Sequence, residues 1–289
     1  MTRYHNDLTW MLKSPELLEL NSELSIRDLT HRMKVSNNFN YKATHRLGVY
    51  FEQLWQHLVY SCESLEVLEH NLQVIIDKHT LGEFDSIIKD KESQKNIHCE
   101  LAVKFYLKVG EGRSLSDWVG PNLRDRFDNK YDRLFEHQLA LSKNELIKQW
   151  LADRNINIDA IKLLTKGRLF YPLDDYMNDD FRYPCEVSTK HLKGFWTSWE
   201  DFAHLQLSSS IDWYLLPKRY WLSKIAPEEV EELRPLDNKA ILIHGHNERY
   251  MFQRIQQVVG VRSGTEIMRG FVVTSEWLQK AKARIKTPS

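Results

Sequence analysis

Two strand-like runs separated by a polar segment constrain the fold of this chain more than any other feature. Residues 84–89 and 97–107 are rich in the β-branched and aromatic side chains that strands favour, and residues 90–96 are wholly polar. This pattern predicts an antiparallel hairpin that turns near Glu92 and Ser93.

The hairpin would bring two carboxylates together. A turn at that place sets Asp85 roughly opposite Glu100, and opposed residues share a sheet face with Cβ atoms about 4.5–5.5 Å apart. Two carboxylates so close repel each other unless a cation lies between them. Oxygen ligands favour Mg²⁺ or Mn²⁺ over zinc, so the pair predicts such an ion. Alternation along the strand puts Ala102 and Lys104 on the same face.

The segment Gly82-Glu83-x-Asp85, with Glu100 on the following strand, resembles the active-site motif of the PD-(D/E)XK nuclease superfamily. The wider chain resembles a bacterial domain-of-unknown-function family placed in that superfamily, family 1853. The residues that carry this second resemblance are 46–52, 82–85, 100–107, 118–122, 137–138 and 269–273. The superfamily pattern has a lysine two residues after the glutamate. Ala102 occupies that position here, and Lys104 lies two residues further on.

The resemblance implies roles for several residues, each with a simpler alternative. Asp85 and Glu100 would hold the metal ion, and Glu52, on a preceding helix, would complete the site or lie on a solvated helix face. Lys104 would stabilise negative charge on a phosphate, or it is a solubilising residue near a strand end. Gln138 would be an active-site glutamine or part of a polar helix surface. The surface reading is favoured for its neighbour His137.

Periodicity extends the prediction along the chain. A helix is expected over residues 46–66, with apolar residues spaced by three and four positions, and a strand over 70–76. Helices over 123–142 and 144–151 and a strand over 166–171 follow the hairpin. Cations around the start of the first of these helices could contact phosphates: Arg113, Arg124, Arg126, Lys130 and Arg133. Asp125, Asp128 and Asp132 offset them, which favours a solvated helix with internal ion pairs.

These elements predict an α/β fold, a mixed central sheet flanked by helices with the αβββαβ order of the PD-(D/E)XK core. Residues 1–173 would form this core with its N-terminal helices, and 174–289 a C-terminal α/β extension packed on it. The extension would contain strands at 194–197, 211–222, 240–244 and 270–274 and helices at 227–233 and 248–259. His244 and His246 have too few companion ligands to predict a zinc site.

Composition limits the function classes. Basic and acidic residues number 40 each, and this neutral balance argues against broad nonspecific nucleic-acid binding but permits a local basic patch. Cys62, Cys99 and Cys185 are widely spaced, which favours reduced core thiols and a cytoplasmic location. No apolar leader follows Met1, and no apolar run is long enough to predict a membrane span.

Together these features predict a Mg²⁺- or Mn²⁺-dependent phosphodiesterase that acts on DNA or RNA through Asp85, Glu100 and Lys104, with Glu52 assisting. The alternative is a nuclease-like fold without cleavage activity that binds nucleic acid or another protein. Ala102 and the zero net charge favour this alternative.

Overall fold

The computed structural model describes residues 3–36, 44, 46–208, 210–236 and 255–286. The chain divides into two compact units that alternate along the sequence. Unit 1 comprises Met1–Val103, Lys130–Lys166 and Ser188–Lys190, and unit 2 comprises Lys104–Asn129, Gly167–Val187 and His191–Ser289. Each unit contains strands and helices, which confirms the predicted α/β class and mixed sheet.

The strands of unit 1 begin with an antiparallel meander of β1 (Leu65–Ile76), β2 (His79–Asp90) and β3 (Lys95–Lys108). A two-residue turn joins β1 to β2, because Asp77 and Lys78 both adopt the positive φ that such hairpin turns need. β5 (Ala160–Pro172) follows β3 in the strand order. The three strands predicted at 70–76, 84–89 and 97–107 are confirmed, and each is longer than predicted.

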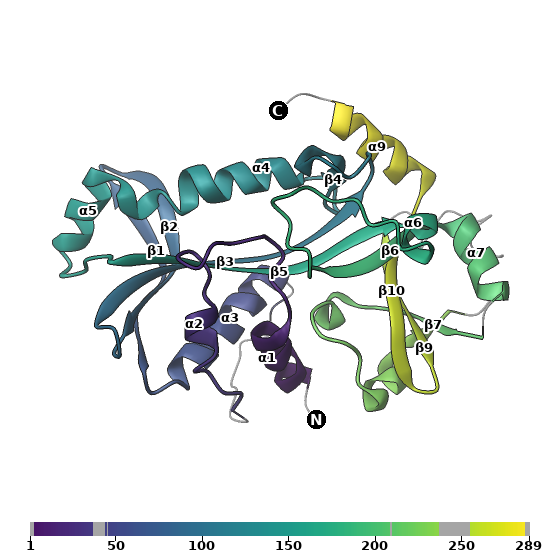
Figure 1. The fold of residues 1–289 in the computed structure, drawn as a ribbon, viewed down its shortest axis with the longest axis horizontal. Helices are drawn as coiled ribbons and strands as arrows, with labels where there is room; N and C mark the ends of the chain where they lie inside the picture. Colours follow the sequence, from purple (N-terminus) through teal and green to yellow (C-terminus); the bar gives the residue numbers. More distant parts are fainter. Residues whose placement is uncertain (1–2, 37–43, 45, 209, 237–254, 287–289) are drawn as a thin grey trace. The chain divides into compact units, whose positions relative to one another are not determined.

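The helices of unit 1 lie on both sides of these strands. α1 (Arg3–Lys13), α2 (Arg27–Thr30) and α3 (Leu47–Tyr60) lie on one side, and α5 (Glu145–Ala152) lies on the other (Figure 1). α3 buries the apolar stripe predicted for it and ends at Tyr60 rather than at residue 66, because β1 already begins at Leu65. On the α5 side, one buried cluster joins strands and helix: Val74, Phe84, Ile87, Leu141, Ile147, Leu151 and Ile156.

The helix predicted over residues 123–142 is interrupted. Leu123 has φ +61°, which no helix residue adopts, so α4 begins at Phe127 and ends at Asp132. A π-helical turn, η2 (Arg133–Gln138), continues it, and a 3₁₀ turn, η3 (Leu141–Lys143), follows. In the π turn the Leu139 amide donates to the carbonyl of Leu134, five residues back. α5 then starts as predicted, with the Asn144 side chain capping its N-terminus.

Unit 2 contains a second set of strands. β6 (Leu192–Ser198) runs parallel to both the end of β5 and β10 (Thr265–Val273), and β9 (Gln256–Arg262) is antiparallel to β10. β7 (Asp212–Leu215) pairs with β9 and with β8 (Arg234–Pro235), and β4 (Trp118–Val119) pairs with the end of β3. The described part of unit 2 also includes α6 (Leu173–Met177), α7 (Trp199–Ser208) and α9 (Ser275–Lys286), with 3₁₀ turns η1 (Leu115–Asp117), η4 (Lys218–Tyr220) and η5 (Pro227–Glu232).

Three predictions for the C-terminal part need correction. The helix predicted at 248–259 is wrong at its described end, where residues 256–259 belong to β9. The strand predicted at 211–222 shortens to β7, and the helix at 227–233 is a 3₁₀ turn. The predicted strand at 240–244, with His244 and His246, lies outside the described residues. The boundary at residue 173 stays a prediction.

The cysteines differ in their surroundings. Cys62 and Cys99 are buried, as predicted for core thiols, whereas Cys185 is exposed, which corrects the prediction for that residue. None of the three forms a disulfide with another described cysteine.

Candidate functional site

The predicted hairpin forms and turns at residues 91–94. Its recorded pairs run from Asp90↔Lys95 to Ser86↔Cys99, and one further step would set Asp85 opposite Glu100. There the strands are joined by a side-chain hydrogen bond: the Leu101 amide donates to Asp85 Oδ2 at 2.9 Å. Asp85 is thereby held beside β3, where Glu100 lies.

The structure brings Asp85 and Glu100 together as a buried carboxyl pair. Glu100 has no exposed surface, and Asp85 is only partly accessible. Burial raises the pKa of Asp85 to about 7, and the Glu100 charge raises it further, while the Leu101 amide and Lys130 oppose the shift. Burial likewise raises the pKa of Glu100 to about 7, against the charge of Lys130. Each carboxyl affects the pKa of the other, so the two titrate as a coupled pair.

Both oxygens of Glu100 are oriented by neighbouring side chains. His98 Nε2 lies 2.9 Å from Oε1, and Gln138 Nε2 donates to Oε2 at 2.8 Å. Burial lowers the pKa of His98 to about 4, with the Asp85 charge opposing, so the ring is neutral at pH 7. When Glu100 is ionised it can only accept, and the ring proton is then on Nε2, with Nδ1 accepting from the Ser142 hydroxyl at 3.3 Å.

A lysine completes this group. Lys130, in the last turn of α4, donates to Gln138 Oε1 at 2.6 Å. Its charge lowers the pKa of both Asp85 and Glu100 against the larger effect of burial. The π-helical turn η2 ends at Gln138, and such turns often occur at functional sites.

Glu52 lies near the carboxyl pair but has a different partner. It is half-buried on α3, and its Oε2 accepts from Asn71 Nδ2 on β1 at 2.9 Å. Burial raises its pKa, and repulsion from Asp85 and Glu83 adds to the shift. Glu52 therefore does not point into bulk solvent, and it contributes negative charge to the surroundings of Asp85.

Lys104 belongs to unit 2, and its ammonium has an acidic partner there. Lys104 Nζ lies 2.7 Å from Asp125 Oδ2, and the same oxygen accepts from the Tyr106 hydroxyl at 3.2 Å. The positive charge of Lys104 is therefore matched by a carboxylate of its own unit.

The donor set of the pair suits one kind of ion. No group of three or more His, Cys, Asp and Glu side chains within the described ranges is arranged to hold a metal. Mg²⁺, however, usually keeps several waters and is held in proteins through one or two carboxylates together with substrate phosphates. Asp85 and Glu100 offer hard oxygens, and a divalent cation would relieve their repulsion. The pair therefore offers the hard oxygen donors that Mg²⁺ and Mn²⁺ prefer.

Sequence reasoning missed His98, Ser142 and the place of Lys130. Strand alternation could have found His98, since it lies two residues before Glu100 and shares its face. Lys130 was considered only as one of several cations of its helix, for which a solvated surface was favoured, and Ser142 carried no signal. His137, favoured as a surface residue, is exposed, as predicted.

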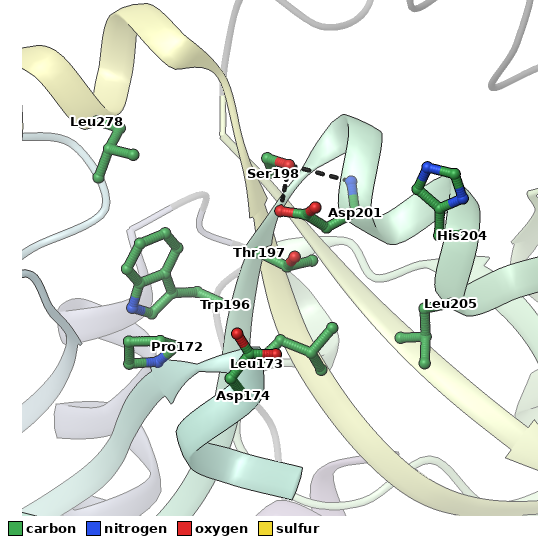
Figure 2. A pocket seen from close by; sticks show the side chains of 10 residues that line it. All are labelled: Pro172, Leu173, Asp174, Trp196, Thr197, Ser198, Asp201, His204, Leu205 and Leu278. Carbon is green, nitrogen blue, oxygen red and sulfur yellow. Dashed lines mark hydrogen bonds between the residues drawn. The ribbon is translucent and has the colours of Figure 1, made fainter.

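Unit 2 contains a cavity of about 760 Å³ at the carboxyl ends of the parallel strands β5 and β6 (Figure 2). Trp196, Pro172 and Leu278 form part of its wall. Ser198 accepts from the Asp201 amide at 3.1 Å and donates to its carboxylate at 2.7 Å, an arrangement that caps the start of α7. These polar groups therefore stabilise a helix end, and none of the predicted site residues lines the cavity.

Comparison with known proteins gives one match. A family model described as "Domain of unknown function (DUF1853)" covers residues 6–273. No curated protein and no solved structure matches the chain. No helix in the described part of the chain is long and apolar enough to cross a membrane.

Proposed function

The chain belongs to the DUF1853 family, and we propose that it is a PD-(D/E)XK-like, metal-dependent phosphodiesterase of DNA or RNA. The observation that supports this proposal most is the buried pair of Asp85 and Glu100. Burying two like-charged groups side by side is costly unless a cation or a proton compensates them. Strongly shifted carboxyls of this kind are common at functional sites.

Asp85 and Glu100 would hold one Mg²⁺ or Mn²⁺, which when bound polarises a phosphate and activates water for attack. His98 and Gln138 fix the two oxygens of Glu100, and the Leu101 amide fixes Asp85, so neither carboxylate must reorganise when the substrate arrives. Glu52, bonded to Asn71, would add negative charge beside the ion.

In the reaction itself, the oxygen of a water molecule donates an electron pair to phosphorus, and a new P–O bond forms. The bond from phosphorus to the leaving sugar oxygen breaks, and that oxygen keeps the bonding pair. The attacking water loses one proton to solvent, and the leaving oxygen gains one, so the net change is hydrolysis.

The test begins with purified protein, labelled DNA and RNA in single- and double-stranded forms, and Mn²⁺ or Mg²⁺. Cleavage should depend on the metal, stop with chelator, and be abolished in Asp85→Asn, which removes the ligand charge but nearly keeps the shape. Mn²⁺ binding, followed by calorimetry, should weaken in the same variant. Asp77→Asn makes the same chemical change on an exposed turn and should leave both readouts at the wild-type level.

Unchanged cleavage in Asp85→Asn would identify a contaminating nuclease and end the proposal. Failure of the wild-type protein both to bind Mn²⁺ and to cleave any substrate would instead favour a non-catalytic nuclease-like module. Two observations favour that second candidate: Ala102 replaces the expected lysine, and Lys104 is paired with Asp125.

A further inference from the structure

Lys130 is connected to the carboxyl pair by a chain of two hydrogen bonds. Its ammonium donates to Gln138 Oε1 at 2.6 Å, and the other end of that amide donates to Glu100 Oε2 at 2.8 Å. The two bonds fix the orientation of the amide, because only its oxygen can accept from a lysine and only its nitrogen can donate to a carboxylate. Gln138 therefore holds a cation on one side and the proposed metal ligand on the other.

The π-helical turn η2 affects how the Lys130 and Gln138 side chains are placed. Its Leu139 amide bonds to the carbonyl five residues back, so side chains beyond it occupy different angular positions from those of a continuous α-helix. Gln138 is the last residue of the turn, and Lys130 lies before it in α4. Both side chains are partly buried rather than extended into solvent.

The two lysines that could act at the site differ in their surroundings. The ammonium of Lys104 pairs with Asp125 in unit 2, so its charge is already matched there. The charge of Lys130 acts on Asp85 and Glu100, and Lys130 is joined to Glu100 through the Gln138 amide. A lysine stabilises phosphoryl chemistry through its charge, which must be directed at the place where negative charge develops.

We propose that Lys130 is the phosphate-contacting cation of this site and that Gln138 positions it beside Glu100. This inference rests on the proposed phosphodiesterase function. Lys130 acts through its charge: it donates a hydrogen bond to a non-bridging phosphate oxygen, which gains charge as the water oxygen bonds to phosphorus. The position that the sequence motif reserves for a strand lysine can then hold Ala102, because the cation comes from a helix.

The first experiment measures binding without cleavage. The full chain is titrated with fluorescent single-stranded DNA and with RNA of the same sequence, in Ca²⁺, over a range of salt concentrations. Lys130→Met should weaken binding about 10-fold. It should also reduce the slope of log affinity against log salt by about 0.7, the loss of one phosphate contact on a single strand. Arg133→Met, an exposed cation on the adjoining turn, should keep the wild-type slope.

The second experiment measures chemistry and metal binding. Lys130→Met and Lys130→Gln should lower kcat about 10²–10³-fold, as the loss of one preorganised charge does. Their affinity for Mn²⁺ should rise, because a cation that repels the ion is gone. Gln138→Leu, which removes the amide between Lys130 and Glu100, should lower kcat less than either Lys130 variant. Thermal unfolding of each variant confirms that the fold is kept.

The outcomes separate the two proposals. If Asp85→Asn abolishes cleavage while Lys130→Met keeps the wild-type salt slope and kcat, the phosphodiesterase proposal stands and the Lys130 assignment is wrong. If kcat and the salt slope fall only in Lys104→Met, Lys104 is the phosphate-contacting cation. If they fall equally in Arg133→Met, the effect comes from the overall positive charge and not from a specific contact. A wild-type protein that binds neither oligonucleotide nor Mn²⁺ overturns both proposals.

Discussion

Asp85 serves both the sheet and the candidate site. Its Oδ2 accepts from the Leu101 amide just beyond the last recorded β2–β3 pair, and its charge lies beside that of Glu100. The hydrogen bond to Leu101 holds the ends of β2 and β3 together. The repulsion between Asp85 and Glu100 opposes folding whenever both groups are ionised. The balance between these effects depends on pH.

The stability of the metal-free protein should therefore fall as pH rises from about 4 to about 7. The pKa values of Asp85 and Glu100 are about 7 in the folded protein, above the ordinary values of 3.8 and 4.5, so the folded state binds more protons across this window. His98, whose pKa is lowered to about 4, acts in the opposite direction. Urea unfolding at pH 5 and at pH 7.5 measures the net change.

Asp85→Asn isolates the contribution of the pair. The variant removes one titrating carboxyl and its repulsion of Glu100, so its free energy of unfolding should fall less between the two pH values than that of the wild type. The Asp77→Asn control should follow the wild-type curve. Parallel pH curves for wild type and Asp85→Asn would contradict the raised pKa values.

The carboxyl pair could be predicted from sequence because a hairpin turn fixes which residues meet across two strands. Lys130 and Gln138 could not be combined in this way, because their contact depends on the π-helical turn that lies between them. The periodicity of residues 123–142 predicts a continuous regular helix and does not indicate the π-helical turn.

Among the elements, the strands of the meander were the most predictable. Their apolar residues are bounded by clear polar segments, and the structure only lengthens them. Residues 256–259 were misassigned to a helix because a short apolar run that is buried on both faces carries no strand periodicity. Val258 and Val259 are both fully buried in β9.

At the same scale, β5 passes very close to β3 at Gly167. This residue has φ +149°, and a Cβ there would clash with the carbonyl oxygen of Lys104. Gly167→Ala should therefore lower the free energy of unfolding by about 3 kcal/mol or more, since backbone atoms must move apart. Chemical denaturation measures the change.

Gly48→Ala provides the matched control for Gly167→Ala. Gly48 lies exposed on α3, and a Cβ there meets nothing within 4 Å. The substitution should raise stability by about 0.5–1 kcal/mol, because alanine restricts the unfolded chain and favours a helix. Equal effects of the two alanines would show that the β3–β5 approach is not strained.

For the whole molecule, the alternation of the two units along the chain limits how it can be divided. Residues 167–172 of β5 belong to unit 2 and pair with β6, which comes later in the sequence. Phe170, in this stretch, packs against Phe271 of β10 with ring centroids 4.6 Å apart. A chain that stops at residue 173 keeps β5 and Phe170 but loses β6 and Phe271, with which they pair and pack.

The fragment 1–173 should therefore aggregate, or unfold at a lower temperature than the full chain, when both are compared by calorimetry under the same conditions. Its exposed apolar strand is the physical cause. A fragment that unfolds at the full-length temperature and binds Mn²⁺ equally well would instead show that residues 174–289 are a separable extension, as the sequence-based boundary predicts.

The hydrogen bond between the Leu101 amide and Asp85 determines which substitution at position 85 is informative in a genetic experiment. Alanine at position 85 would remove both the hydrogen bond that joins the two strands and the negative charge. Asparagine keeps an oxygen that can accept from the Leu101 amide and removes only the charge. An assay of cleavage alone would score both alleles as inactive. Because the asparagine allele keeps the sheet contact, it alone would separate lost chemistry from a weakened scaffold.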